Sequence, residues 1–320
     1  MRAVRFHEHG GTDALQVDEI DRPEAGAGRV VVEVAGAGVN PVDTYFRDGS
    51  YQPFTLPMTP GVDFAGTVAE VGEGVEGLSV GDPVYGTGVG RNHHGAYAEY
   101  VAAPEEFLVR LPEGVDLVEA GGAGVAAVTA WRALVDHAAL EPAEVALVHG
   151  GSGGVGHVGV QLAASMSARV LTTAAPTYHD RLEALGADVV FDYGREDLQA
   201  AVEEVAGDGV DVILDHRLDD YFQFDADVAA IGARVVGIGE NEPSVGLDNP
   251  SLARLKDVRY QLMSMFNTPD LRVPLARLAS LMAAGDLSIG VARTYDLEEA
   301  GEAQRAVMED SFLGKLVITP

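Results

Sequence analysis

The chain has 320 residues, of which 47% are hydrophobic, so it is long enough for two domains and apolar enough for packed cores. Its 50 acidic and 21 basic residues give a net charge of −29, and only Lys256 and Lys315 are lysines. Such a chain is not expected to bind nucleic acid or a membrane surface, which are recognised largely through Lys and Arg. The acid excess with so few lysines favours a halophilic protein over one that is simply well solvated.

The sequence contains no cysteine, which excludes disulfides, a thiolate nucleophile and a Cys-rich zinc site. The opening residues MRAVRFHEHG lack the apolar core of a signal peptide, and no run approaches 18 apolar residues. We therefore expect a cytoplasmic protein.

The first 120 or so residues are predicted to be rich in β-structure. Short Val-rich or alternating runs at 29–40, 63–75, 80–88 and 95–104 are separated by Gly and Pro, as strands usually are. From about residue 121 the pattern changes, because 123–138 has helical spacing.

Strands and helices then alternate up to about residue 266. Repeated strand–helix–strand units with Val-rich strands predict a parallel, doubly wound sheet. The apolar run 258–266 is expected to be a further strand and a dimer edge, and 314–320 a terminal strand. The predicted strands are 144–150, 168–173, 188–193, 210–215 and 233–239, and the helices between them are 155–166, 179–186, 196–207 and 221–231.

A glycine-rich turn joins the first of these strands to its helix, within VALVHGGSGGVGHVGVQLA at 145–163. Glycines in this position allow a tight turn and let backbone N–H groups approach a pyrophosphate at the helix N-terminus. Between the first strand and helix of such a repeat, the turn predicts dinucleotide binding. The expected contacts are Gly150, Ser152, Gly153, Gly154, Val155 and Gly156.

The end of the second strand bears on which nicotinamide cofactor binds. An NAD site normally places an acid there for the ribose 2′-OH, but 171–177 reads LTTAAPT and the next acid is Asp180. Because a carboxylate would repel a 2′-phosphate, its absence favours NADP. The candidate contacts in this region are Thr173, His179, Arg181 and Tyr193.

Five ordered motifs now resemble one family over essentially the whole chain. The chain is similar to the medium-chain dehydrogenase/reductase superfamily and, within it, to the zinc-free quinone oxidoreductases related to zeta-crystallin. The motifs are 38–51 (GVNPVDTYFRDGSY), 60–75 (PGVDFAGTVAEVGEGV), 80–88 (VGDPVYGTG), the glycine turn and 314–320 (GKLVITP).

This resemblance implies an α/β protein in which a Rossmann domain is inserted into a β-rich, GroES-like catalytic domain. The catalytic domain would comprise residues 1–123 and 267–320, and the Rossmann domain residues 124–266. The active site would lie in the cleft between them. Members are commonly homodimers or homotetramers.

The resemblance also bears on metal binding. Zinc-dependent members have Cys where Asn40 stands and a His–Glu pair after the turn that reads Gly61, Val62, Asp63 here. The adjacent His93 and His94 are not expected to reach one metal ion. We therefore predict a metal-free enzyme.

By resemblance, Asn40, Asp43, Tyr45 and Tyr51 would lie near the nicotinamide and the substrate. Asn40 would hydrogen-bond the cofactor or a carbonyl, and either tyrosine would stack on a flat ring or donate a proton. Further candidates for contacting the cofactor are Thr129, Ile238, Gly239 and Lys315, of which Lys315 either meets the phosphates or only packs its strand.

Two segments depart from the family pattern. The Lys usual after the second Rossmann strand is missing, which predicts a weaker preference for NADPH over NADH than is usual in the family. The Gly pair usual after the fourth strand is replaced by LDHRLDD at 214–220, where Asp219 and Asp220 would disfavour phosphates unless they turn to solvent.

The sequence therefore predicts an NADPH-dependent reductase that passes hydride to a quinone or another conjugated carbonyl acceptor. One alternative is a 2-enoyl thioester or alkenal reductase of the same superfamily. Another, of a different class, is an NADPH-binding sensor or structural protein with little catalysis.

Overall fold

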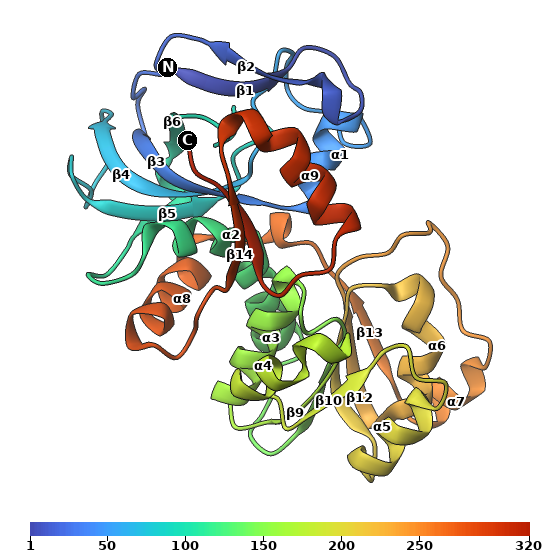
Figure 1. Cartoon of the computed structure of the whole chain (residues 1–320). Helices are drawn as coiled ribbons and strands as arrows, with labels where there is room; N and C mark the ends of the chain where they lie inside the picture. The colour runs from blue at the N-terminus through green and yellow to red at the C-terminus, as the bar shows by residue number, and fades with distance from the viewer. The chain divides into compact units, whose positions relative to one another are not determined.

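The computed structural model describes residues 1–320 and divides into two compact units. Unit 1 comprises Met1–Val128 and Pro269–Pro320, and unit 2 comprises Thr129–Thr268. Unit 2 is thus one continuous insertion in unit 1, which contains both ends of the chain (Figure 1). The expected boundaries, after residues 123 and 266, lie close to these divisions.

Unit 2 contains a parallel six-stranded sheet in the order β10-β9-β8-β11-β12-β13. The order reverses between β8 and β11, the first and fourth strands along the chain. In open α/β sheets, ligands bind at the carboxyl ends of the strands beside such a reversal. The strands are β8 (Val145–Val148), β9 (Arg169–Ala174), β10 (Val189–Asp192), β11 (Val210–Asp215), β12 (Ala229–Gly237) and β13 (Arg259–Leu262).

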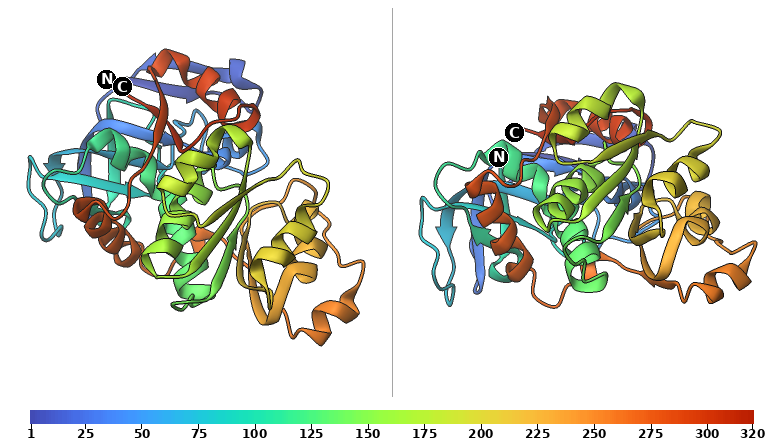
Figure 2. Two further views of the ribbon diagram at one scale, coloured as in Figure 1. Left: turned by 60° about the horizontal axis from the view of Figure 1, so that its bottom comes forward. Right: turned by 90° about the horizontal axis from the view of Figure 1, so that it is seen from below.

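Helices cover both faces of this sheet (Figure 2). Alternate residues of a strand point to opposite faces, so Leu147 and Ile213 join the apolar cluster with α5, whereas Val148 and Leu214 face α3 at Gly159. A doubly wound α/β fold is thereby confirmed. The helices are α3 (Gly154–Ser165), α4 (His179–Ala184), α5 (Leu198–Ala206), α6 (Leu218–Val228) and α7 (Pro250–Leu255), with short 3₁₀ turns at Pro176–Tyr178 and Met265–Asn267.

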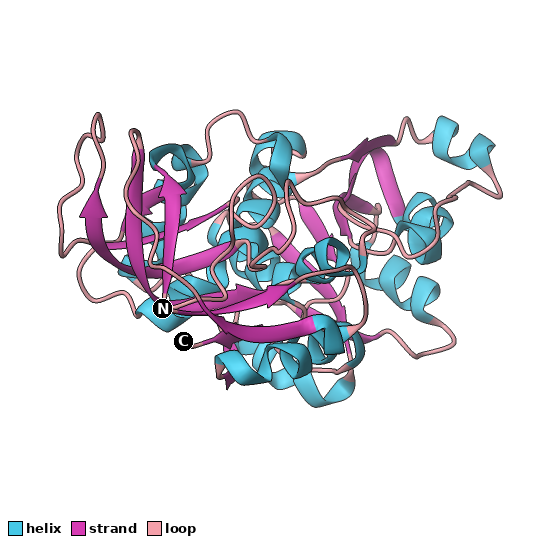
Figure 3. Ribbon diagram, turned by 90° about the horizontal axis from the view of Figure 1, so that it is seen from above, coloured by secondary structure: helices cyan, strands magenta, loops and turns pink.

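Unit 1 is built on a mixed seven-stranded sheet with the order β14-β15-β3-β4-β5-β7, in which β6 also pairs with β3. A separate β1–β2 hairpin completes its strands, drawn in magenta in Figure 3. The terminal strand β15 pairs antiparallel with β3, so the two ends of the chain share one sheet. The strands are β1 (Arg2–Phe6), β2 (Leu15–Glu19), β3 (Arg29–Val39), β4 (Asp63–Val71), β5 (Pro83–Thr87), β6 (Tyr100–Pro104), β7 (Leu108–Arg110), β14 (Val291–Tyr295) and β15 (Lys315–Ile318).

Four helices accompany this sheet, and α2 continues across the first boundary into unit 2. No helix of the chain combines the length and apolar character needed to cross a membrane. The helices are α1 (Pro41–Asp48), α2 (Leu117–Trp131), α8 (Arg272–Ala284) and α9 (Ala300–Glu309), with 3₁₀ turns at Thr12–Ala14, Glu105–Phe107 and Leu297–Glu299.

Two predicted helices have different bounds in the structure. The helix expected at 123–138 begins at Leu117, and its last part, Arg132–His137, is a π-helix. The helix expected at 221–231 spans Leu218–Val228, and β12 starts at once with Ala229. The run Val228–Ile231 is apolar, and apolar residues alone do not distinguish the end of a buried helix from the start of a buried strand.

Candidate functional site

The glycine-rich turn follows β8, where the strand order of unit 2 reverses. Gly150 adopts a positive φ of 66°, and its N–H donates to Thr173 Oγ1 at 3.0 Å. The N–H of Gly151 donates to the Thr173 carbonyl at 2.8 Å. Thr173, expected to contact the cofactor, thus holds the turn against β9 with both its side chain and its backbone.

The turn leads directly into the N-terminus of α3. A Cβ on Gly156 would lie 2.1 Å from the Gly150 carbonyl oxygen, so only glycine allows this approach. The first N–H groups of a helix have no carbonyl partner within it, and they carry partial positive charge. Those of Gly154, Val155 and Gly156 start α3 beside the half-exposed Ser152 and Gly153. This cradle fits a pyrophosphate.

The other cofactor candidates of unit 2 lie near the same edge of the sheet. Ile238 N–H donates to the Asp215 carbonyl at 2.8 Å, and the Gly239 carbonyl accepts from Leu218 N–H at 3.1 Å, which ties the ends of β11 and β12 together. Thr129 is buried in α2.

The residues after β9 and β10 differ in how far they are free to meet a phosphate. His179 Nε2 lies 3.2 Å from the Ala174 carbonyl, and Tyr193 is exposed after β10. Arg181 is exposed on α4 and forms no ion pair, whereas Arg195 is bound to Asp197 at 2.8 Å. Arg181 therefore carries the uncommitted positive charge of this region.

In unit 1, Asn40 ends β3 and caps α1. Its backbone N–H donates to Asp43 Oδ2 at 2.9 Å, and Asp43 also accepts from Val62 N–H and the Tyr97 hydroxyl. Burial raises the pKa of Asp43 to about 7. Asp43 thus anchors α1 to β4 and does not face solvent.

The Asn40 carboxamide lies between Lys315 of β15 and Asp63 of β4. Lys315 Nζ donates to Asn40 Oδ1 at 2.5 Å and to the Val39 carbonyl at 2.9 Å. Asn40 Nδ2 donates to Asp63 Oδ2 at 2.8 Å. Lys315 is 3% exposed, so its ammonium is packed against Asn40.

The two tyrosine candidates form a pair above this network. The rings of Tyr45 and Tyr51 meet edge to face with centroids 5.5 Å apart, and Tyr51 N–H donates to the Tyr45 carbonyl at 2.8 Å. Tyr51 is 51% exposed, while Tyr45 is half-buried in α1. This geometry presents aromatic surface and one phenol to solvent.

Comparisons with known proteins agree with this arrangement. Residues 26–113 match the family described as alcohol dehydrogenase GroES-like domain, and residues 185–318 match zinc-binding dehydrogenase. The chain is 33% identical to the quinone oxidoreductase of Lama guanicoe, across 99% of this chain and 97% of the relative. The chain belongs to the medium-chain dehydrogenase/reductase superfamily.

Further matches include a solved structure and a segment of a polyketide synthase. The Escherichia coli quinone oxidoreductase complexed with NADPH has the same fold, with a TM-score of 0.89, 26% identity and full coverage of both chains. A segment making up 5% of the polyketide synthase GfsB of Streptomyces halstedii is 34% identical over 91% of this chain. The protein is an oxidoreductase, and the resemblance inferred from its motifs is confirmed.

The positions of the zinc ligands in zinc-dependent members of the superfamily carry other groups in this chain. Asn40 and Asp63 bond to each other, and the Lys315 ammonium lies against Asn40. A cation already in place and an amide in place of a thiolate do not fit a zinc ion. No three His, Asp or Glu side chains elsewhere are arranged to hold a metal.

The segment that departs from the superfamily pattern neutralises part of its own charge. Asp220 is paired with Arg217 at 2.6 Å, and Asp219 Oδ1 accepts from Asn241 N–H at 2.9 Å. Asp220 is exposed, so it meets the condition that an acid at this place must turn to solvent if phosphates are to bind nearby. His216 packs against Gly150, since a Cβ on that glycine would lie 2.5 Å from its ring.

A buried polar cluster beneath the turn was not predicted. His149, the last residue before the glycines, has its Nε2 2.9 Å from Asp225 Oδ1 on α6, and both side chains are fully buried. Asp215 at the end of β11 interacts with Asp225. The signal in the sequence was Asp225 itself, an acid between Phe224 and Ala226 on the buried face of an amphipathic helix.

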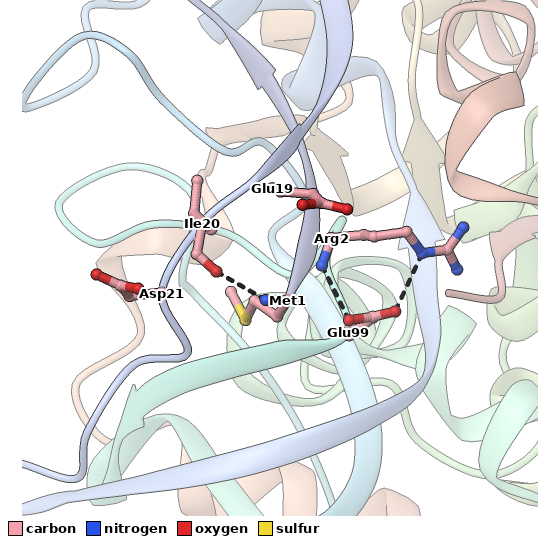
Figure 4. A pocket seen from close by; sticks show the side chains of 6 residues that line it. All are labelled: Met1, Arg2, Glu19, Ile20, Asp21 and Glu99. Carbon is pink, nitrogen blue, oxygen red and sulfur yellow. Dashed lines mark hydrogen bonds and ion pairs between the residues drawn. The ribbon is translucent and has the colours of Figure 1, made fainter.

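An open groove of unit 1 lies elsewhere and contains no candidate residue. It has a volume of about 750 Å³ and includes the ion pair of Arg2 with Glu99 at 3.0 Å (Figure 4). The Met1 ammonium donates to the Ile20 carbonyl across its floor. The Met1 bond closes the open end of the β1–β2 hairpin, and the Arg2–Glu99 pair attaches the hairpin to the segment before β6.

Proposed function

We propose that the protein is a metal-independent, NADPH-dependent reductase that passes hydride to a quinone or a similar conjugated carbonyl acceptor. The observation that carries this proposal is the glycine cradle at the strand reversal of unit 2, in a chain similar to quinone oxidoreductases over its whole length. Once bound, the reduced nicotinamide would supply the hydride.

The residues of the chain would then bind the cofactor, orient the acceptor and supply a proton to it. The N–H groups of Gly154 to Gly156 would hold the pyrophosphate, and Arg181 would meet the 2′-phosphate. The exposed face of Tyr51, packed on Tyr45, would lie along a flat acceptor. Reduction of a quinone to a hydroquinone needs one hydride and one proton, which neutralises the oxygen left anionic, and a tyrosine hydroxyl or water would supply that proton.

The decisive experiment is oxidation of NADPH and of NADH with a panel of quinones, enones and enals in molar KCl. We expect turnover with quinones and a lower KM for NADPH. Binding of NADPH without turnover of any acceptor would instead favour the sensor or structural protein. Metal analysis of the active protein is expected to find no stoichiometric zinc.

A second candidate function is reduction of a 2-enoyl thioester or an alkenal. The similarity to the GfsB segment favours it, because that relative belongs to a polyketide synthase. The α-carbon of an enone must be protonated, whereas a quinone accepts its proton on oxygen. If one of the two tyrosine hydroxyls protonates the α-carbon, its removal in Tyr45→Phe or Tyr51→Phe should lower kcat for enones by at least tenfold. The same variant should lower kcat for quinones by less.

The free edge of the parallel sheet supports a homodimer. β13 is the last strand of the order, and Leu262 on it is 58% exposed. An exposed apolar edge is available for pairing with a second copy. We expect sedimentation to show a dimer in molar KCl, and Leu262→Pro, which removes an N–H of the free edge, to shift it toward monomer.

A further inference from the structure

Two opposite charges determine the orientation of the Asn40 carboxamide. Its oxygen faces the Lys315 ammonium and its nitrogen faces the Asp63 carboxylate, at 2.5 and 2.8 Å. A flipped amide would set NH₂ against an ammonium and C=O against a carboxylate, so both contacts would become repulsive. The pair therefore permits one orientation.

The backbone around this network leaves room for it. A Cβ on Gly124 would lie 2.3 Å from Asp63 Oδ1, and one on Gly38 would lie 3.0 Å from Oδ2. Val125 N–H donates to Asp63 Oδ1 at 2.8 Å. Asp63 is fully buried and Lys315 nearly so, which means that neither charge is directed to solvent.

The network continues into the helix that carries the tyrosines. Asn40 is the N-cap of α1, and its N–H is bound by Asp43 in the first turn. Tyr45 follows on the same short helix, and its carbonyl holds Tyr51. A change in the position of Asn40 would therefore move the surface proposed to meet the acceptor.

We propose that Lys315 and Asp63 are positioning residues for acceptor reduction, which hold Asn40 and the first turn of α1, and that Lys315 is not a ligand of the cofactor phosphates. This inference rests on the proposed function for its kinetic effect. The three residues come from β15, the end of β3 and β4, so distant parts of the chain would cooperate in one role.

The test compares Lys315→Met and the charge-neutral double variant Asp63→Asn/Lys315→Met with wild type. We expect kcat for the best quinone to fall at least tenfold in both, with the Kd for NADPH changed less than twofold. Lys256→Met is the matched control, because the other lysine only donates to the carbonyls of Ala226 and Asp227 in unit 2. It should change neither quantity.

A double-mutant cycle separates positioning from a general loss of stability. In an Asn40→Ala background, Lys315→Met should cause less than a twofold further loss of kcat, because the group it acts through is gone. An additive tenfold loss would overturn the proposal. So would a tenfold weaker Kd for NADPH with kcat intact, which would make Lys315 a phosphate ligand.

Hydrogen exchange distinguishes this inference from the proposed function. Amides of residues 42–48 should exchange at least tenfold faster in the double variant than in wild type or Lys256→Met, whether or not any acceptor is reduced. If wild type reduces nothing, the proposed function fails and the exchange result still decides the positioning role. Unchanged exchange of α1 would refute it.

Discussion

The imidazole of His149 and the carboxylate of Asp225 lie 2.9 Å apart, Nε2 to Oδ1, with neither side chain reached by solvent. Tyr221 stacks on the imidazole with ring centroids 4.1 Å apart. Burial lowers the pKa of His149 to about 4, and burial with the nearby Asp225 raises that of Asp215 to about 7. Both pKa shifts agree with a neutral imidazole beside two carboxyl groups that share one retained proton.

Replacing Asp225 by Asn should change how stability depends on pH. The raised pKa of the acid pair contributes stability that is complete below pH 4 and is lost as pH rises toward 7. The lowered pKa of His149 contributes stability that is complete above pH 6.5 and is lost as pH falls toward 4. These two slopes oppose each other in the wild type, and Asp225→Asn removes the contribution of Asp225 to the first.

The expected result is a free energy of unfolding that rises with pH between 4.5 and 6.5, by about 1.4 kcal/mol per pH unit relative to wild type. Urea unfolding at several pH values measures it. Asp227→Asn is the control, because Asp227 is half-buried on the same helix and its carboxylate bonds only Gln223. Parallel pH profiles for wild type and Asp225→Asn would show that the pair holds no extra proton.

The glycine cradle can be tested at a position where a methyl group requires only a small shift of the free protein. A Cβ on Gly153 would lie 3.3 Å from the nearest atom, the Gly150 oxygen, and its φ of −70° suits any residue. Gly153→Ala should therefore keep the melting temperature within a few degrees, yet raise the Kd for NADPH at least tenfold by obstructing the pyrophosphate.

Gly246→Ala is the matched control, since nothing lies within 4 Å of a Cβ there. Fluorescence titration gives both Kd values. Equal affinity of Gly153→Ala and wild type for NADPH would remove the cofactor from this turn. Gly156→Ala is unsuitable, because its methyl group would collide with Gly150 and disturb the fold itself.

The parallel sheet and the glycine turn were predictable because their signals are local. Val-rich strands of four to nine residues alternate with helices, and the turn has its glycines where a Cβ collides. The role of Thr173 was not predictable, because it depends on the position of Gly150 across the sheet. The same holds for Lys315, whose partner Asn40 is 275 residues away in the sequence.

The preference for NADPH should depend on Arg181. Among the cations after β9 and β10, Arg195 is bound to Asp197, while Arg181 is exposed without an ion pair. Arg181→Ala should raise the KM for NADPH about tenfold and leave that for NADH unchanged, since only the former carries the 2′-phosphate. Arg195→Ala should alter neither. If Arg181→Ala weakens both cofactors equally, the residue does not read the phosphate.

Salt should stabilise this protein and spare its cofactor binding. The net charge is −29, and both lysines donate to internal acceptors, Lys315 to Val39 and Asn40 and Lys256 to Ala226 and Asp227. Repulsion between the surface carboxylates is therefore not offset by lysines, and it persists until salt shortens the Debye length to about 3 Å at 1 M.

The melting temperature should rise with KCl up to molar concentration, and the affinity for NADPH should not weaken over that range. This follows because backbone N–H groups would hold the pyrophosphate, with Arg181 as the one cationic contact, while salt also screens the surrounding acids. A melting temperature independent of KCl would argue against adaptation to salt, and an affinity that collapses with KCl would require cationic contacts other than Arg181.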